Sequence, residues 1–413
     1  MKAGETPQRR TGGQRVLIYS HDSFGLGHLR RCRAIANALV EAYRDLSVLI
    51  ISGSPIIGSF DFGERVDFVR MPGMIKLSNG DYTSHTLDLA AEHTLEVRAT
   101  ILEHTAAAFD PDILIVDKEP LGLRGEAEAT LKTLKERGTR LVLGLRDIMD
   151  DPDQLAPEWE RKKAMPALEN LYDEIWVYGL PQICEPLKGL AVPSSVSRKM
   201  VYTGYLRREA SSYAASLEVP SLTEEPFILI TPGGGGDGED LVDWVLKAYE
   251  SNPGLRPRAL VVFGPFMGQE LQRDFRERAS ALAAVDVITF DANMESLIAE
   301  ADGVIAMGGY NTFCEILSFD KRAIIMPRTR PRMEQHIRAS RSAALGLVGM
   351  IDGSGARDAH TMATALRRLS SQPKPSDIIV PGLLDGLDSV KRLVGQAFEA
   401  GRFRRLKLAR GTD

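Results

Sequence analysis

The sequence has few cysteines and no long apolar run. Cys32, Cys184 and Cys314 are its only cysteines, odd in number and far apart in the chain. Such sparse usage suits a reducing cytoplasm and argues against a disulfide framework or a cysteine-rich metal site. No run approaches the roughly 18 apolar residues of a membrane span, and the polar N-terminal segment has no hydrophobic signal region. We therefore expect a cytoplasmic protein whose cysteines serve in packing.

The chain also lacks a strong net charge. Its 51 basic and 56 acidic residues leave a formal charge of −5 at pH 7. This balance argues against a general nucleic-acid surface, so we expect small or neutral partners and no nucleic acid. With 413 residues, of which 44% are hydrophobic, the chain is long enough for two or three globular domains.

Two common ligand motifs are incomplete. The loop after the apolar run at 15–19 carries Gly25 and Gly27, but Arg30 stands where a dinucleotide fingerprint has its third glycine. NAD is therefore a poor candidate. The stretch Asp-Pro-Asp at 151–153 resembles a metal-binding DxD motif, but it contains a proline and does not lie between apolar strands. We predict a turn there and no metal site.

Short apolar runs alternate with helical stretches throughout the chain. This alternation predicts α/β domains, each with a doubly wound parallel sheet covered by helices on both faces. The predicted strands are 15–19, 47–52, 66–71, 113–117, 141–145 and 175–178 in a first domain, and 227–231, 260–263, 287–290, 303–307, 323–326 and 347–351 in a second.

The pattern divides the chain into five parts. We predict a disordered tail at 1–14, an N-terminal Rossmann-like domain at 15–205, a linker at 206–225, a C-terminal Rossmann-like domain at 226–382, and a helix at 383–413 that packs across the two lobes. The end of that helix carries five basic residues. These form a solvated face or make weak peripheral contact with anionic lipid at the inner face of a membrane, and they are Arg402, Arg404, Arg405, Lys407 and Arg410.

Three glycine-rich turns each connect a predicted strand with a helix. They lie at 20–28, 232–238 and 308–309. Glycine allows a ligand to approach the backbone, and the free N–H groups and dipole of a helix N-terminus favour an anion. The third turn is followed by Tyr310 and Asn311 and then by Thr312 and Glu315, which have the spacing of a capping box. We therefore expect a phosphate to bind over residues 309–312.

A second strand, loop and helix follow at once. The predicted strand 323–326 ends before a loop that contains Arg328, Arg330 and Arg332, and a helix begins at Glu334-Gln335. If the strands are parallel, both loops lie at the same edge of the sheet. Phosphate donors and acceptors for sugar hydroxyls would then share one crevice.

This arrangement resembles the nucleotide-sugar half of GT-B glycosyltransferases. It is particularly similar to family 28, the MurG-like group that contains the lipid-linked N-acetylglucosamine transferase of peptidoglycan synthesis. The matching residues are Gly308-Gly309, Glu315 and Glu334-Gln335. The resemblance implies that the glycine turn meets the donor diphosphate, the helix glutamate meets the ribose, and the Glu-Gln pair meets the sugar.

The same resemblance implies further site residues. The loop at 232–238, with Gly234 and Gly235, would face the diphosphate from the other side, and His28 would open the acceptor-side helix. Apart from the resemblance, Glu119 follows the strand 113–117, and since ligands of open α/β sheets bind beyond the carboxyl ends of strands, it would contact the acceptor or form a salt bridge. The full set of donor-binding candidates is Gly25, Gly27, Gly234, Gly235, Gly308, Gly309, Asn311, Thr312, Glu315, Arg328, Arg332, Glu334 and Gln335.

The reaction implied by the resemblance is transfer of a sugar from a nucleotide diphosphate, with UDP preferred, to an acceptor hydroxyl. It would be inverting and metal-independent and would need no separate cofactor. His28 is the candidate general base because its ordinary pKa lies near neutrality, and His21 and Asp22 are the alternatives. The acceptor is a saccharide, a lipid-linked group or a small molecule. A nucleotide-sugar hydrolase, an epimerase and a non-catalytic binding protein remain alternatives.

Overall fold

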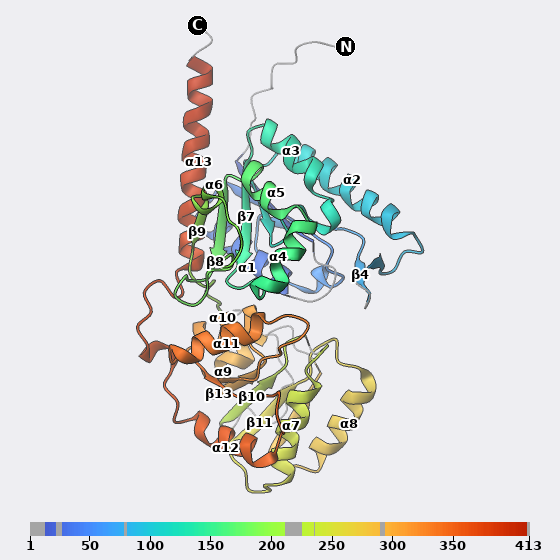
Figure 1. Cartoon of the computed structure of the whole chain (residues 1–413), viewed down its shortest axis with the longest axis vertical. Coiled ribbons are helices and arrows are strands. Elements are labelled where there is room, and N and C mark those ends of the chain that lie inside the picture. Colours follow the sequence, from blue (N-terminus) through green and yellow to red (C-terminus); the bar gives the residue numbers. More distant parts are fainter. Residues whose placement is uncertain are drawn as a thin grey trace.

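Two lobes, each built on a parallel sheet, make up the protein (Figure 1). A computed structural model describes residues 13–21, 27–77, 81–210, 225–234, 236–289 and 294–410. Both predicted sheets are present, which confirms the α/β class with two doubly wound domains.

The N-terminal lobe contains a seven-stranded sheet with the order β3-β2-β1-β6-β7-β8-β9, and every neighbouring pair is parallel. Its central strands are apolar and buried, as expected where helices cover both faces of a sheet. A separate antiparallel pair, β4 and β5, was not predicted from the sequence. The strands are β1 (Gln14–Ser20), β2 (Leu46–Ser52), β3 (Val66–Arg70), β4 (Met74–Lys76), β5 (Tyr82–Ser84), β6 (Ile113–Asp117), β7 (Arg140–Arg146), β8 (Glu174–Tyr178) and β9 (Met200–Tyr202).

The C-terminal lobe contains a six-stranded parallel sheet with the order β12-β11-β10-β13-β14-β15. Each of its strands overlaps a predicted one. The strands are β10 (Phe227–Thr231), β11 (Arg258–Val262), β12 (Val285–Ile288), β13 (Gly303–Ala306), β14 (Arg322–Ile325) and β15 (Gly349–Met350).

Helices flank both sheets, and their buried residues fall at helical spacing. In α7, for example, Leu241, Val242, Val245 and Leu246 are all buried, as the sequence predicts. The helices are α1 (Gly27–Ala42), α2 (Ala91–Phe109), α3 (Glu128–Glu136), α4 (Pro152–Arg161), α5 (Ala164–Asn170), α6 (Ser194–Ser197), α7 (Glu239–Glu250), α8 (Gln269–Ser280), α9 (Met294–Glu300), α10 (Tyr310–Ser318), α11 (Glu334–Ala344), α12 (Ala359–Leu369) and α13 (Gly386–Arg410), with 3₁₀ turns at Ile57–Ser59, Leu123–Gly125 and Pro375–Asp377.

Two local predictions were wrong. The stretch 151–153 is a helix start, because Asp151 is the N-cap of α4 and its side chain accepts a hydrogen bond from the Asp153 N–H at 3.0 Å. The capping box at Thr312 does not form either. The N-cap of α10 lies three residues earlier, at Gly309, and no side chain caps the helix.

The last helix returns to the first lobe. Figure 1 shows α13 running beside the N-terminal lobe, although it follows the C-terminal lobe in sequence. Val390, Leu393 and Val394 are buried in this packing, and the hydroxyl of Tyr43 donates to the Lys391 carbonyl at 2.8 Å. Where the chain crosses back, Gly204 has a φ of +90°, and a Cβ there would lie 2.3 Å from the Gly382 carbonyl oxygen. Only glycine fits this crossing.

Both sheets have the strand order of a doubly wound fold, in which the direction of winding reverses once. The reversal lies between β1 and β6 in the first sheet and between β10 and β13 in the second. Ligands of such folds bind beyond the carboxyl ends of the strands at this point. The residues that follow these four strands are therefore the first place to look for a site.

Candidate active site

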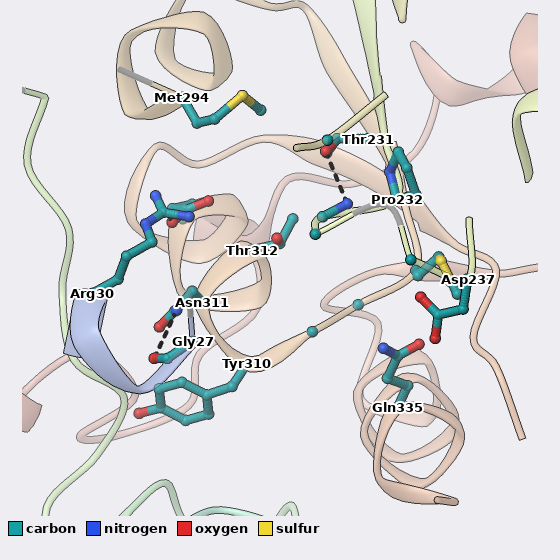
Figure 2. Close-up of a pocket in the computed structure, with 18 of the residues that line it drawn as sticks. Gly27, Arg30, Thr231, Pro232, Asp237, Met294, Tyr310, Asn311, Thr312 and Gln335 are labelled. Carbon is teal, nitrogen blue, oxygen red and sulfur yellow. Dashed lines mark hydrogen bonds and ion pairs between the residues drawn. The ribbon is translucent and has the colours of Figure 1, made fainter. Parts of the chain in front are cut away.

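A cavity of about 480 Å³ lies between the lobes at the two reversal points. One wall comes from the start of α1 and the end of β7, and the other comes from the loops after β10, β13 and β14. Figure 2 shows side chains of the cavity wall that converge on the cavity from both lobes. The polar and glycine residues of the wall include Gly27, His28, Arg30, Arg31, Arg146, Thr231, Gly233, Gly234, Asp237, Gly308, Gly309, Asn311, Thr312, Glu315, Arg328, Glu334 and Gln335.

The N-terminus of α10 opens into this cavity. Gly308 turns the chain with a φ of +78°, and Gly309 caps the helix without a side-chain hydrogen bond. The first N–H groups of a helix have no partner within it, so the turn presents donors and a positive dipole end to the cavity. Thr312 lies in the same first turn and lines the cavity beside them (Figure 2). The arrangement is suited to bind a phosphate.

A second glycine loop faces this helix from β10. The hydroxyl of Thr231 accepts a hydrogen bond from the Gly233 N–H at 3.1 Å, and Gly233 has a φ of +83°. Asp237, at the far end of the loop, forms an ion pair with Arg328. The loop therefore offers backbone groups to a ligand while its one acidic side chain is neutralised.

On the opposite wall, His28 is joined to a buried carboxylate. Its Nδ1 contacts Asp117 Oδ2, and Asp117 is the last residue of β6. Arg31 donates two hydrogen bonds to the same carboxylate, at 2.8 and 2.6 Å. Burial alone would raise the pKa of Asp117, but Arg31 and His28 outweigh it and hold the pKa well below its ordinary value. Asp117 is therefore an anion that orients the ring and leaves Nε2 of His28 for a substrate.

His21 lies behind His28. The two rings meet edge to face, with their centroids 4.8 Å apart. Burial lowers the pKa of His21 well below its ordinary value, and the neighbouring His28 lowers it further. His21 is not part of the cavity wall, so it supports the His28 ring and is less well placed than His28 to take a proton from a ligand.

Glu315 is buried, at 1% exposure, and it meets a side chain from the other lobe. Arg30 of α1 lies 2.6 Å from Glu315 and 2.7 Å from Glu295 of α9. Burial raises the pKa of Glu315 to about 7, although Arg30 opposes the shift. In Figure 2 the Arg30 side chain extends toward α10, next to Asn311. Asn311 in turn donates to the Gly27 carbonyl at 3.0 Å.

Glu334 and Gln335 lie at the start of α11, at the other end of the cavity. Arg146 of β7 lies 2.5 Å from Glu334, and Arg328 lies 3.4 Å from its other oxygen. Burial would raise the pKa of Glu334, but Arg146 and Arg338 lower it to about 2. The side-chain oxygen of Gln335 accepts a hydrogen bond from the Arg328 N–H at 3.2 Å. The Glu-Gln pair is thus held rigidly.

Two predicted site residues lie outside the cavity wall and form ion pairs. Arg332 does not line the cavity, because its guanidinium binds Asp150 at 3.2 Å and Glu158 at 2.9 Å across the lobes. Glu119 forms the salt bridge that was one of its two predicted roles, with Lys162 at 2.7 Å. Both residues therefore hold parts of the protein together.

The other predicted site residues divide into two groups. Ten of the thirteen donor-binding candidates line the cavity together with His28, and they are Gly27, Gly234, Gly308, Gly309, Asn311, Thr312, Glu315, Arg328, Glu334 and Gln335. Asp22, Gly25 and Gly235 lie outside the described residues.

Three residues of the site were not predicted in these roles. They are Asp117, Arg31 and Arg146. Asp117 could have been found, because it ends a buried strand next to the reversal point. Arg31 could have been found as well, since it follows His28 by three residues and shares its helix face. Nothing in the local sequence distinguishes Arg146.

The described part of the chain contains neither a metal-binding cluster nor a membrane-spanning helix. No group of three or more His, Cys, Asp or Glu residues in that part could hold a metal ion. No described helix combines the length and apolar character needed to cross a membrane.

The fold defines the class of the protein. Two facing doubly wound lobes with a cleft between them form the GT-B fold. TcCGT1 in complex with UDP superposes with a TM-score of 0.65 and 14% identity over 94% of this chain and 100% of that one. MurG of Acinetobacter baumannii superposes with a TM-score of 0.54 and 13% identity over 92% of this chain and 95% of that one.

The sequence comparisons narrow the class. Residues 227–372 match the glycosyltransferase family 28 C-terminal domain. The C-terminal lobe thus matches the family 28 domain and the whole chain has the GT-B fold, and together these findings support a MurG-like GT-B glycosyltransferase.

Two relatives show the range of similarity. The UDP-N-acetylglucosamine--N-acetylmuramyl-(pentapeptide) pyrophosphoryl-undecaprenol N-acetylglucosamine transferase of Mesorhizobium japonicum is 25% identical over 210 residues, which are 51% of this chain and 52% of that protein. The chain thus spans about half the length of this relative. An uncharacterized glycosyltransferase of Methanosarcina acetivorans is 24% identical over 319 residues, 73% of this chain and 77% of that protein.

Proposed function

We propose that the protein transfers a sugar from a nucleotide-diphosphate sugar to an acceptor hydroxyl. The single observation that carries the proposal is the cavity itself. It places a histidine-aspartate pair on one wall and an uncapped helix N-terminus on the other. A base for the acceptor and a site for the departing diphosphate thus face the same space.

The residues give each step a physical role. The acceptor hydroxyl passes its proton to Nε2 of His28 as its oxygen attacks the anomeric carbon. The bond between that carbon and the diphosphate oxygen breaks, and its electron pair leaves with the diphosphate. The N-terminus of α10 and Arg328 stabilise this charge. Attack from the face opposite the leaving group inverts the anomeric configuration.

UDP is the preferred nucleotide. A structural neighbour was solved in complex with UDP, and a sequence relative is named for a UDP-linked donor. In this proposal Glu315, which lines the cavity, accepts hydrogen bonds from the ribose once Arg30 moves aside, and Glu334 and Gln335 contact the sugar. The helix N-terminus and arginines supply positive charge, so the proposal includes no metal ion and no separate cofactor.

A panel of nucleoside diphosphates in a thermal-shift assay tests the donor site, because a ligand that binds only the folded protein raises its melting temperature. We expect UDP to give the largest increase. Donor sugars are then supplied with and without candidate saccharide, lipid-linked and small-molecule acceptors, and free sugar is followed. Acceptor-dependent consumption supports transfer. Rapid release of free sugar without an acceptor would instead indicate a hydrolase, and conversion of the donor into another nucleotide sugar would indicate an epimerase.

A further inference from the structure

A buried arginine lies directly behind the proposed base. Arg31 follows His28 by three residues in α1, so the two side chains share one face of the helix. Arg31 is only 1% exposed, although it carries a full charge. Buried charges are expensive unless they are paired and hydrogen-bonded, so Arg31 must be held by strong partners.

Its main partner is Asp117. The guanidinium donates to both carboxylate oxygens, from Nε at 2.8 Å and from NH2 at 2.6 Å. The same NH2 group lies 3.2 Å from Nδ1 of His28. Because Asp117 also contacts Nδ1, one carboxylate is shared between the guanidinium and the imidazole. This two-point grip fixes the plane of the carboxylate, which a lysine ammonium could not do.

The position of the Asp117 carboxylate, held by Arg31, also determines where the His28 proton lies. A carboxylate anion accepts a proton, so the close contact with Asp117 places the hydrogen of the neutral ring on Nδ1. Nε2 then carries the lone pair.

Arg31 also reaches the donor lobe. Its guanidinium lies over the ring of Tyr310 at 5.4 Å from the centroid, and Tyr310 is the first residue of α10. Arg338 lies over the same ring at 5.8 Å and donates to the Gly308 carbonyl at 2.8 Å. The base is therefore linked through one aromatic ring to the turn that would bind the diphosphate.

We propose that Arg31 is a positioning residue for the reaction: it fixes Asp117 behind His28 and couples this pair to the donor-binding turn through Tyr310. The inference rests on the proposed function, in which His28 is the base. The charged or titratable groups that face the His28 ring are Arg31 on its own helix, Asp117 from β6 and His21 from the loop after β1.

Histidine NMR tests the first part without any activity measurement. The His28 ring signal is assigned by its loss in His28→Gln and followed through a pH titration in wild type, Arg31→Gln and Arg31→Lys. Loss of the positive charge in Arg31→Gln should raise the titration midpoint above that of wild type, because a like charge next to the ring is removed. Arg31→Lys keeps the charge, so its midpoint should stay near that of wild type.

Steady-state kinetics distinguishes positioning from mere support of the fold. The acid limb of kcat/KM in Arg31→Gln should move to higher pH by the same amount as the NMR midpoint. Arg31→Lys should lower kcat by about tenfold or more with little change in the donor KM, because the carboxylate is no longer gripped at two points. Arg140→Lys is the control, since it alters an ion pair with Glu174 at the amino ends of the strands, far from the cavity.

Addition of UDP, with the His28 NMR signal as the readout, tests the coupling between the His28 pair and the donor-binding turn. UDP should shift the His28 signal in wild type and in Tyr310→Phe, which keeps the ring, but not in Tyr310→Leu. An unchanged titration midpoint in Arg31→Gln would overturn the proposal that Arg31 acts on His28. An equal UDP-induced shift in wild type, Tyr310→Phe and Tyr310→Leu would overturn the coupling through Tyr310. If Arg31→Gln does not fold, Arg31→Lys and the Tyr310 variants still decide. If no donor is turned over, the proposed function fails, while the titration still shows whether Arg31 controls His28.

Discussion

Asp147 and Arg338 join the two lobes through hydrogen bonds of 2.7 and 2.8 Å, and neither side chain is more than 1% exposed. Asp147 follows β7 in the N-terminal lobe, and Arg338 lies in α11 of the C-terminal lobe. The hydroxyl of Tyr205 donates to the same carboxylate at 2.8 Å. The lobes are therefore held together by a fully paired charge cluster beside the cavity.

Breaking this pair should destabilise the protein strongly. Asp147→Asn leaves the Arg338 charge buried without its counter-ion, which typically costs about 3–5 kcal/mol. We expect a lower urea midpoint of unfolding. The control is Arg140→Gln, which breaks a partly exposed pair with Glu174 and should cost no more than about 1 kcal/mol. Equal midpoints for the two variants would show that the interlobe pair contributes nothing special.

A second interlobe pair should make the protein sensitive to acid. The pKa of Glu334 is lowered from 4.5 to about 2 in the folded state. A lowered pKa means that the contribution to stability is present above pH 4.5 and is lost as the pH falls toward 2. This lowering of the pKa corresponds to about 3 kcal/mol of stability.

Glu334→Gln tests this effect. The variant lacks the titrating group, so its free energy of unfolding should fall less than that of wild type between pH 4.5 and pH 2. Urea titrations at several pH values measure the difference. Parallel curves for the two proteins would contradict the lowered pKa and would weaken the assignment of the Arg146 contact.

The sequence predicts those features of the structure that are determined by residues close together in the chain. The buried strands and glycine turns were predictable because periodicity and turn chemistry act over a few residues. The N-cap of α10 was misplaced by three residues, since Thr312 has the sequence of an N-cap but Gly309 already provides the turn. Local signals therefore located the glycine turn before α10 well but not the first residue of the helix.

The contacts between the lobes could not be predicted from the sequence, for a different reason. Arg332 looked like a phosphate ligand because it lies in a basic loop, but its partners Asp150 and Glu158 come from the other lobe. The pairing of Arg146 with Glu334 arises in the same way. Such pairs depend on how the two sheets face one another, and a short-range sequence pattern does not predict this arrangement.

Removal of the proposed base should affect turnover rather than donor binding. His28→Ala is expected to lower kcat by about 10²-fold to 10⁴-fold, with the UDP affinity nearly unchanged. His104→Ala is a suitable control because its ring lies on an exposed part of α2. Undiminished turnover in His28→Ala would transfer the role of base to His21 or Asp22.

Binding of nucleoside diphosphates should persist in a metal chelator. The N-terminus of α10 and Arg328 provide positive charge at the cavity, where a metal-dependent enzyme would use a carboxylate-bound cation. UDP affinity is measured by calorimetry with and without EDTA. A large loss of affinity in EDTA, restored by added Mg²⁺, would contradict the metal-independent proposal.

Glu315 gives the sharpest test of the donor site. Burial raises its pKa from 4.5 to about 7, which is the opposite direction from Glu334. The folded protein then holds a proton that the unfolded chain has lost, so the stability of wild type should fall as the pH rises from 4.5 to 7. Glu315→Gln should lack this slope, because glutamine does not titrate.

The same variant should bind the nucleotide more weakly. Above pH 7, where Glu315 is ionised, a charged oxygen that accepts a hydrogen bond from a ribose hydroxyl is replaced by a neutral amide, and charge-assisted hydrogen bonds are about twice as strong as neutral ones. Wild type should therefore prefer UDP to its 2′-deoxy or 3′-deoxy analogue more strongly than Glu315→Gln does. Unchanged affinity in the variant, together with full discrimination against the deoxy analogues, would leave Glu315 only its ion pair with Arg30, which then serves to hold α1 against α10.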